Sequence, residues 1–286
     1  MKIAITGTSS GIGLRSAVLF AERGHQVVGL VRDVQRGARA LDGVDAAARD
    51  RISLRELDLA SHSSIRGAAD HLLSEGPLDA LVNNAATFDL SVRDARTTVD
   101  GHELFWATNH LGPTELTARL SPALASAGSP SIVFVASKGL VTLPRIRIRF
   151  DALDGSGWFT PTRAYYHAKL AQVMTAMSLA ERAPRSWRIS CVRVPAVRLD
   201  ADRLSHQPPI LRALYAPKNR LAASPDSIAE AYLSQIEGAP RNPSDVYVDE
   251  HGSSVSPPRF ARDDLARRKL WECTQEQTEV TSHGVV

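Results

Sequence analysis

The chain has 286 residues, of which 43% are hydrophobic and 23% charged, a composition typical of a globular protein with one buried core. Its net charge of +3 arises from basic residues scattered among 31 acidic ones, which argues against a nucleic-acid-binding surface. No apolar run of about 18 residues and no charged leader occurs, and the only cysteines, Cys191 and Cys273, form no CxxC motif. We therefore expect a soluble cytoplasmic protein without a metal site that binds neither nucleic acid nor a membrane.

Short β-branched runs alternate with longer amphipathic stretches as far as residue 194, which is typical of βαβ units around a parallel sheet. The expected strands are Lys2–Thr6, Gln26–Val31, Ile52–Asp58, Ala80–Asn83, Ser131–Ser137 and Arg188–Val194. The expected helices are Gly11–Arg23, Ser63–Ser74, Val99–Ala127 and Arg163–Ala183. The pattern predicts an α/β fold: a single-domain, Rossmann-type, doubly wound parallel sheet of about seven strands with helices on both faces.

The regular alternation stops after residue 195. Arg198–Ala223 contains prolines and apolar side chains without a regular period, and we expect it to be a substrate lid. Ser224-Pro225-Asp226 predicts a capped helix start, with the helix ending near Glu237. The last expected elements are a strand at Val246–Val248, a helix at Asp263–Gln277 and a flexible tail at 278–286. A single domain would thus cover residues 1–277.

A glycine-rich loop follows the first expected strand and opens the first helix. Glycine lets the backbone approach a phosphate closely or adopt positive φ, and the amides of a helix N-terminus hold anions. The G-x-x-x-G-x-G spacing is a weak signal alone, and its place between strand and helix strengthens it. The residues expected to hold a cofactor's pyrophosphate are Gly7, Ser9, Ser10, Gly11, Ile12 and Gly13. The alternative is an ordinary glycine-rich turn.

The end of the second strand indicates which cofactor binds. In NAD-binding folds an acidic residue there bonds the ribose hydroxyls, whereas an arginine accommodates the 2′-phosphate of NADP. Val31 occupies the position of that acidic residue, and Arg32 follows it with a planar set of donors suited to phosphate. NADP(H) is therefore the expected cofactor; the alternative is that Arg32 faces water or pairs with Asp33.

Further motifs follow in chain order. They are Asp58-Leu59, Asn83-Asn84-Ala85-Ala86, Asn109-His110-Leu111-Gly112, Ser137, Tyr165-Tyr166-His167-Ala168-Lys169 and Pro195-Ala196. With the glycine-rich loop, they resemble the motifs of the short-chain dehydrogenase/reductase superfamily. Arg32-Asp33, an insertion at 138–162 and Leu270-Trp271-Glu272 add a narrower resemblance to its retinol dehydrogenase and protochlorophyllide reductase branch. The departures from the pattern are Ala86, Ala196, Arg193 and Val197-Arg198-Leu199-Asp200.

The resemblance implies roles for these residues. Asp58 and Leu59 would contact the adenine. Further cofactor contacts would come from Asn84, Ala85, Pro195, Val197, Tyr165 and Lys169. The catalytic residues would be Asn109, Ser137, Tyr165 and Lys169. Ser137 would hydrogen-bond the substrate oxygen, Lys169 would hold the nicotinamide ribose, and Asn109 would position a water. A homodimer or homotetramer is also implied.

Tyr165 and Lys169 are four residues apart, so on a helix they share a face about 6 Å apart along the axis. A nearby ammonium stabilises a phenolate, so we expect Lys169, with the oxidised nicotinamide, to lower the pKa of Tyr165 toward neutrality. Tyr165 could then exchange a proton with a substrate oxygen. The residue four after Tyr166 is Leu170, so the same pairing excludes Tyr166.

These features predict an NADP(H)-dependent oxidoreductase that interconverts a carbonyl and an alcohol on a partly hydrophobic small molecule. Two alternatives stay open: reduction of a C=C double bond, and a non-catalytic NADP(H)-binding regulator. Arg145–Phe150 alternates arginine with apolar residues, which predicts a short strand with one solvated face. With Arg193 and Arg198, it could instead recognise an anionic substrate.

Overall fold

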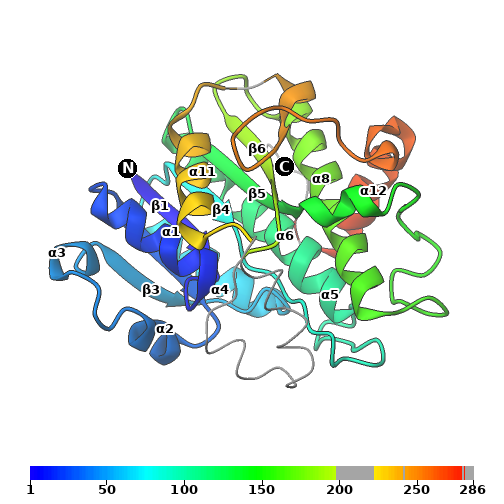
Figure 1. The fold of residues 1–286 in the computed structure, drawn as a ribbon, viewed down its shortest axis with the longest axis horizontal. Helices are drawn as coiled ribbons and strands as arrows, with labels where there is room; N and C mark the ends of the chain where they lie inside the picture. Colours follow the sequence, from blue (N-terminus) through cyan, green and yellow to red (C-terminus); the bar gives the residue numbers. More distant parts are fainter. Residues whose placement is uncertain (198–221, 241, 279, 281–286) are drawn as a thin grey trace.

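A single parallel sheet runs through the computed structural model, which describes residues 1–197, 222–240, 242–278 and 280 (Figure 1). Its strands are β1 (Lys2–Thr6), β2 (Gln26–Val31), β3 (Ile52–Glu56), β4 (Ala80–Asn83), β5 (Ser131–Ser137), β6 (Arg188–Val194) and β7 (Tyr247–Val248). Their order is β3-β2-β1-β4-β5-β6-β7, so the winding direction reverses between β1 and β4. Ligands of open α/β sheets bind at such a reversal, beyond the carboxyl ends of the strands. The predicted doubly wound sheet is confirmed.

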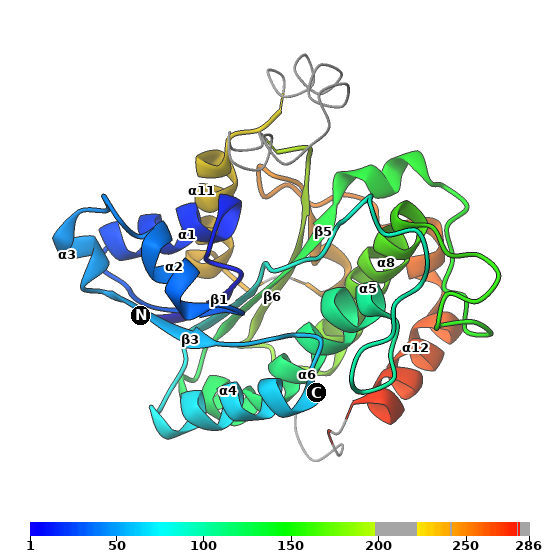
Figure 2. The ribbon, with the colours of Figure 1, turned by 90° about the horizontal axis from the view of Figure 1, so that it is seen from below.

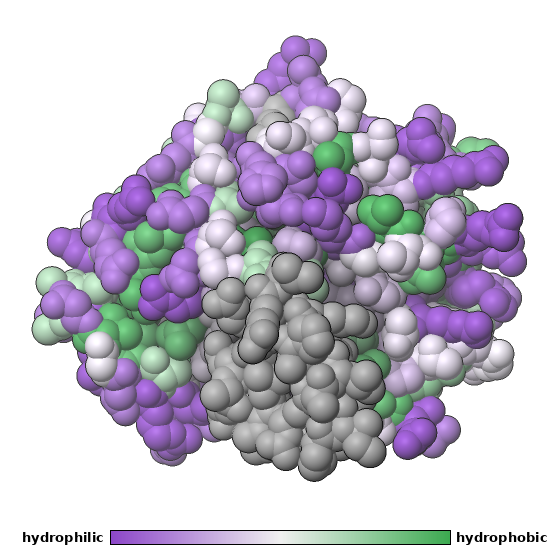
Figure 3. Space-filling model, viewed as in Figure 1, coloured by the Kyte–Doolittle hydropathy of each residue, from purple (hydrophilic) through white to green (hydrophobic). Residues whose placement is uncertain are grey.

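Helices cover both faces of the sheet (Figure 2). One face carries α1 (Gly11–Glu22) and α11 (Pro225–Glu237), which pack against each other. The other carries α4 (His62–Ser74), α6 (Gly112–Arg119) and α8 (Pro161–Arg182), and α12 (Asp264–Gln277) packs against α8. Because successive side chains of a strand point to opposite faces, Ile3 and Ile5 enter one core and Ala4 the other. On the face seen in Figure 3, hydrophilic residues are spread among smaller hydrophobic areas.

Several shorter elements connect these layers. They are α2 (Val34–Ala40), α3 (Ala46–Arg49), α5 (Leu104–Trp106), α7 (Ser121–Ser126), the π-helical η1 (Ala107–Leu111) and the 3₁₀ segments η2 (Lys138–Thr142), η3 (Pro243–Asp245) and η4 (Arg259–Arg262). The sequence did not predict α2 and α3, because helices of two turns or fewer are too short to show a clear amphipathic period.

The single helix predicted over Val99–Ala127 is wrong. Helical structure begins only at Leu104 and is divided into α5, η1, α6 and α7. Pro113 and Pro122 lie at the starts of α6 and α7, and proline cannot donate the backbone hydrogen bond that continues an α-helix. Segments of π-helix often relieve such interruptions near functional sites.

The strand predicted at Arg145–Phe150 is also wrong. The segment follows η2 as turn and coil, although the alternation did predict burial: Ile148 is buried, while Arg145 and Arg147 are exposed. A strand needs a hydrogen-bonding neighbour, and β5, the strand before this segment, is already paired with β4 and β6. The alternation of charged and apolar residues therefore predicted which side chains are buried, but not whether the backbone pairs as a strand.

The predicted helix start at Ser224-Pro225-Asp226 is present in the structure. The side chain of Ser224 accepts a hydrogen bond from the Ser227 amide and caps α11, as predicted. A bridge between Val197 and Ala223 joins the two ends of the expected lid. The lid itself at 198–221, and most of the expected tail, lie outside the described residues. Within the described ranges, no helix is both long and apolar enough to cross a membrane.

Candidate active site

The glycine-rich loop lies between β1 and α1, at the reversal of the sheet. Gly7 has a φ of +80° and Gly11 a φ of +57°, which disfavour any residue with a Cβ. A Cβ at Gly13 would lie 2.2 Å from the carbonyl oxygen of Gly7. The loop therefore requires these glycines. With Ser9, Ser10 and Ile12 it lies at the start of α1, where backbone amides can hold an anion, and its role in phosphate binding stays a prediction.

The segment after β4 is tied to the end of β1. Asn84 Nδ2 donates to the Thr6 carbonyl at 2.9 Å, and the Ala85 amide donates to Thr6 Oγ1 at 2.9 Å. Tyr232, on α11, donates its hydroxyl to Asn84 Oδ1 at 3.3 Å. The structure thus brings Asn84 and Ala85 beside the glycine-rich loop, and it adds Tyr232, which sequence reasoning missed because α11 is distant in sequence.

Arg32 lies exposed at the end of β2. The neighbouring strand is β1, and the glycine-rich loop follows it. Asp33 does not form an ion pair with it: the Asp33 carboxylate accepts from the Arg36 amide at 2.9 Å and caps α2. Arg32 has no ion pair within the part of the chain that the structure describes. Its guanidinium is therefore available to an anion beside the loop.

Asp58 and Leu59 follow β3, the edge strand beyond β2. Asp58 Oδ1 accepts from the Ala60 amide at 2.9 Å, and the Asp58 amide donates to Ser64 Oγ at 2.9 Å. A Cβ at Gly112 would lie 2.2 Å from the Leu59 carbonyl oxygen. The glycine therefore lets the start of α6 pack closely against this segment. These contacts hold the expected adenine-binding residues against η1 and α6.

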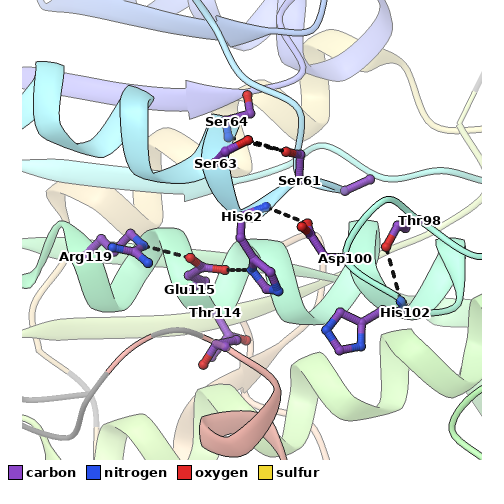
Figure 4. A network of polar contacts seen from close by, with 12 residues as sticks. Ser61, His62, Ser63, Ser64, Thr98, Asp100, His102, Thr114, Glu115 and Arg119 are labelled. Carbon is purple, nitrogen blue, oxygen red and sulfur yellow. Dashed lines mark hydrogen bonds and ion pairs between the residues drawn. The ribbon is translucent and has the colours of Figure 1, made fainter.

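A network of polar side chains continues from that segment (Figure 4). Glu115, wholly buried on α6, accepts from Arg119 Nε at 2.7 Å and pairs with His62 Nδ1. The His62 amide donates to Asp100 Oδ2 at 2.8 Å. The network joins the start of α4 to α6 and to the loop before α5. It therefore stabilises the segment that contains Asp58, which directly precedes α4.

Ser137 and Tyr165 meet at the carboxyl end of β5. Ser137 is the last residue of β5, and Tyr165 lies near the start of α8, whose N-cap Thr160 accepts from the Arg163 amide at 3.2 Å. The Ser137 hydroxyl lies close enough to the Tyr165 phenol to act toward a lower pKa of Tyr165. The Tyr165 ring also contacts the ring of Phe88, with 4.5 Å between the centroids.

The expected lowering of the Tyr165 pKa is not what the protein's own groups produce. Burial raises the pKa of Tyr165 to about 12, with a further increase from Tyr166, and the nearby Ser137 hydroxyl only partly opposes this. Desolvation of the phenolate is therefore the largest effect among the protein's own groups. Tyr165 is a protonated donor at neutral pH.

Lys169 lies one turn further along α8 and is buried, with 1% of its surface exposed. Its Nζ is 5.9 Å from the centroid of the Tyr165 ring. The ammonium donates to the Val135 carbonyl at 2.6 Å and to Gln172 Oε1 at 2.8 Å. Burial lowers its pKa to about 8, and only Cys191 opposes this shift. The predicted pairing on one helix face is present, and Gln172 is an additional partner.

Asn109 lies in the π-helical segment η1 and is wholly buried. Its Oδ1 accepts from the Thr87 amide at 2.7 Å, and its Nδ2 donates to the Thr87 carbonyl at 2.9 Å. Its amide therefore holds the loop after β4, next to Phe88. The expected role of Asn109 in positioning a water stays a prediction.

The sequence also excluded Tyr166 as the catalytic tyrosine and named Pro195 and Val197 as cofactor contacts. A Cβ at Gly139 would lie 2.1 Å from the Tyr166 hydroxyl, which therefore faces the turn after β5. Pro195 and Val197 follow β6, where the Ala223 amide donates to the Ala196 carbonyl at 3.0 Å. All the strand-end residues of the predicted site thus lie at the carboxyl edge of one sheet.

Besides Tyr232, sequence reasoning missed Gln172 and Phe88. Gln172 could have been found, because it is three residues after Lys169 and a helix places such residues on one face. Phe88 lies in a loop without a period, and only the fold brings it to Tyr165.

The comparisons with known proteins agree with this geometry. The model of the short chain dehydrogenase family matches residues 1–145. The human dehydrogenase/reductase SDR family member 13 is 33% identical over 279 residues, which cover 95% of this chain and 71% of that protein. The chain belongs to the short-chain dehydrogenase family.

Other relatives of this short-chain dehydrogenase lie in the predicted branch. Mouse retinol dehydrogenase 14 is 29% identical, covering 96% of this chain and 84% of its own. Pea chloroplastic protochlorophyllide reductase is 28% identical, covering 96% of this chain and 77% of its own.

The structure of an uncharacterized protein from Mycobacterium paratuberculosis has a TM-score of 0.72 and 26% identity, covering 98% of this chain and 93% of that one. A short chain dehydrogenase from Shigella flexneri complexed with NADP shares the fold at 20% identity and a TM-score of 0.65, covering 87% of this chain and 96% of that one.

Proposed function

We propose that this short-chain dehydrogenase uses NADP(H) to interconvert a ketone or aldehyde with an alcohol on a partly hydrophobic small molecule. The observation that carries the proposal is that Ser137, at the end of β5, and Tyr165, on α8, lie together, with the Lys169 ammonium 5.9 Å from the centroid of the Tyr165 ring. A partly buried phenol that stays protonated at neutral pH is a general acid, as carbonyl reduction requires.

The residues present fit a dinucleotide phosphate. The close approach of Gly13 to the Gly7 carbonyl leaves the backbone amides at the start of α1 open to a pyrophosphate. The exposed guanidinium of Arg32 suits a 2′-phosphate, and the NADP complex of the related Shigella protein has the same fold. When bound, NADPH supplies the hydride.

The protein's own groups supply the proton. In the reductive direction, Ser137 donates a hydrogen bond to the substrate carbonyl oxygen and Tyr165 transfers its phenolic proton to that oxygen. The carbonyl carbon gains the hydride, the oxygen gains the proton, and the product is an alcohol. The Lys169 ammonium stabilises the phenolate that remains until Tyr165 takes up a proton from water.

The substitution Tyr165→Phe tests the assignment. It removes only the hydroxyl, so the fold and NADPH affinity should survive while turnover falls about 10²–10⁴-fold. Lys169→Met should lose turnover and also weaken NADPH binding, because its ammonium is assigned to both the tyrosine and the ribose. Tyr166→Phe is the matched control and should be mild. The measurements are NADPH oxidation against a panel of carbonyl compounds and cofactor affinity by titration.

Each rival has its own outcome in the same experiments. Retained turnover in Tyr165→Phe with loss of turnover in Tyr166→Phe would show that Tyr166, and not Tyr165, is the catalytic tyrosine. Product analysis showing a saturated C–C bond would favour C=C reduction. Tight NADPH binding without turnover of any compound would favour a regulator. The cytoplasmic location and a homodimer or homotetramer stay predictions.

A further inference from the structure

Gln172 is a buried polar residue for which the mechanism above has no use. Its side chain is wholly buried on α8, three residues after Lys169, and its Oε1 accepts from Lys169 Nζ at 2.8 Å. Its Nε2 has no hydrogen-bond partner in the described part of the chain. A buried amide with an unpaired donor destabilises a fold, so an apolar side chain would serve packing better at this position.

The surroundings of Lys169 explain what the amide oxygen does. The titratable groups that face the ammonium are Tyr165 on its own helix and Cys191 on β6, while Tyr232 of α11 faces those two. Among the described residues, no carboxylate is hydrogen-bonded to Lys169. Two neutral oxygens, the Val135 carbonyl and Gln172 Oε1, are therefore what stabilises this buried positive charge.

We propose that Gln172 is a positioning residue that keeps the Lys169 ammonium charged behind Tyr165 and thereby sets the upper pH limit of the reaction. The proposal rests on the proposed function, because the charge matters only if Tyr165 gives up its proton. Once Lys169 is neutral, the phenolate loses its stabilising partner and reduction slows. Val135 contributes through its backbone, so Gln172 is the partner that substitution can change.

Two substitutions at Gln172 should act in opposite directions. Gln172→Met keeps the length of the side chain and removes the acceptor, which disfavours the charged lysine. Gln172→Glu puts a carboxylate beside the ammonium and favours the charged lysine. A purely structural role would weaken the protein in both variants without giving the two shifts opposite signs.

The first measurement needs no substrate. The chain has five lysines, so lysine labelled with ¹³C at Cε gives a simple NMR spectrum in which Lys169→Met identifies the Lys169 signal. We expect the Lys169 titration midpoint to fall by about one pH unit in Gln172→Met and to rise in Gln172→Glu, the size expected for one hydrogen bond to a charged group. Thr175→Val, which removes a buried hydroxyl from the same helix, should leave the midpoint unchanged.

The second measurement follows NADPH oxidation against pH with any carbonyl compound that the wild type reduces. The alkaline limb of kcat should move in the same direction as the NMR midpoint in each variant. Unchanged midpoints, or shifts of the same sign in both variants, would overturn the role of Gln172. If one variant does not fold, the sign of the other alone decides. Shifted midpoints in a protein that reduces no carbonyl compound would instead overturn the proposed function and leave the Gln172–Lys169 contact established.

Discussion

Arg32 is the side chain that decides between the two nicotinamide cofactors in the proposed function. Because it is exposed at the end of β2 and Asp33 is engaged with α2, Arg32→Ala should remove one contact to the 2′-phosphate. NADPH binding should weaken by about 1.5–3 kcal/mol, with NADH binding nearly unchanged. Titration with both cofactors measures this, and the exposed Arg36 supplies the control variant Arg36→Ala. A wild type that prefers NADH would contradict the assignment.

Phe88 is the residue placed to select among substrates. Its ring contacts the Tyr165 ring and is 47% exposed, and the amide of Asn109 holds the backbone of its neighbour Thr87. Phe88→Ala should lower kcat/KM for a bulky apolar ketone by about tenfold, the scale of one lost apolar contact, and spare a small ketone. Leu90→Ala, another exposed apolar residue in the same loop, is the control. Equal losses on both ketones would assign Phe88 to the support of Tyr165.

At the scale of elements, α12 secures the π-helical segment that carries Asn109. Thr274 donates its hydroxyl to the Leu270 carbonyl at 2.7 Å and lies 2.9 Å from His110 Nε2. Since the hydroxyl proton is engaged, Nε2 of His110 must be the donor, which determines the tautomer. Trp106 Nε1 adds a hydrogen bond to Gln277 Oε1 at 2.9 Å. The C-terminal helix therefore anchors η1 through Thr274 and the preceding α5 through Gln277.

Thr274→Val should uncouple this anchor. It leaves the buried Nε2–H of His110 without an acceptor, which should lower the free energy of unfolding by about 1–3 kcal/mol. Urea denaturation followed by circular dichroism measures the loss, and Thr274→Ser, which keeps the hydroxyl, should restore most of it. If serine were as destabilising as valine, packing of the methyl group rather than the hydrogen bond would explain the effect.

At the scale of the whole molecule, two buried histidines should make the protein sensitive to acid. Burial lowers the pKa of His110 and of His167 from 6.5 to about 3, with a further lowering of the His110 pKa by His167 and of the His167 pKa by Arg149. The unfolded chain therefore binds more protons than the folded one between these values. Stability is fully present above pH 6.5 and is lost as the pH falls toward 3, by up to about 1.4 kcal/mol per pH unit for each histidine.

His167→Gln tests this contribution. Glutamine keeps an acceptor for the Arg149 amide, which donates to His167 Nε2 at 2.9 Å, and removes the titrating group. The pH dependence of the unfolding free energy between pH 6.5 and 4 should become shallower by about one proton. His251→Gln, at an exposed histidine, is the control. An unchanged slope in His167→Gln would mean that carboxylates dominate the acid response.

Local patterns in the sequence were sufficient for the sheet and for the residues that line its carboxyl edge. Period and β-branched runs located β1 through β6, and the spacing of four residues paired Tyr165 with Lys169, because strand formation and helix-face pairing depend on residues a few positions apart. Ser137 was named by the resemblance to the family. The local patterns failed at Val99–Ala127 and at Arg145–Phe150, where proline and the lack of a free strand edge overrode the local period.

The chemistry of the site depended on tertiary structure. The sequence determined that Tyr165 and Lys169 share a helix face, and it led to the expectation that the ammonium lowers the tyrosine pKa. Only the fold decided how deeply both groups lie in the protein, and among the protein's own groups desolvation raises the pKa of Tyr165 and lowers that of Lys169. The contact of Phe88 with Tyr165 likewise joins segments far apart in the chain. Desolvation and long-range contacts are properties of the assembled core, so spacing along the sequence could not reveal them.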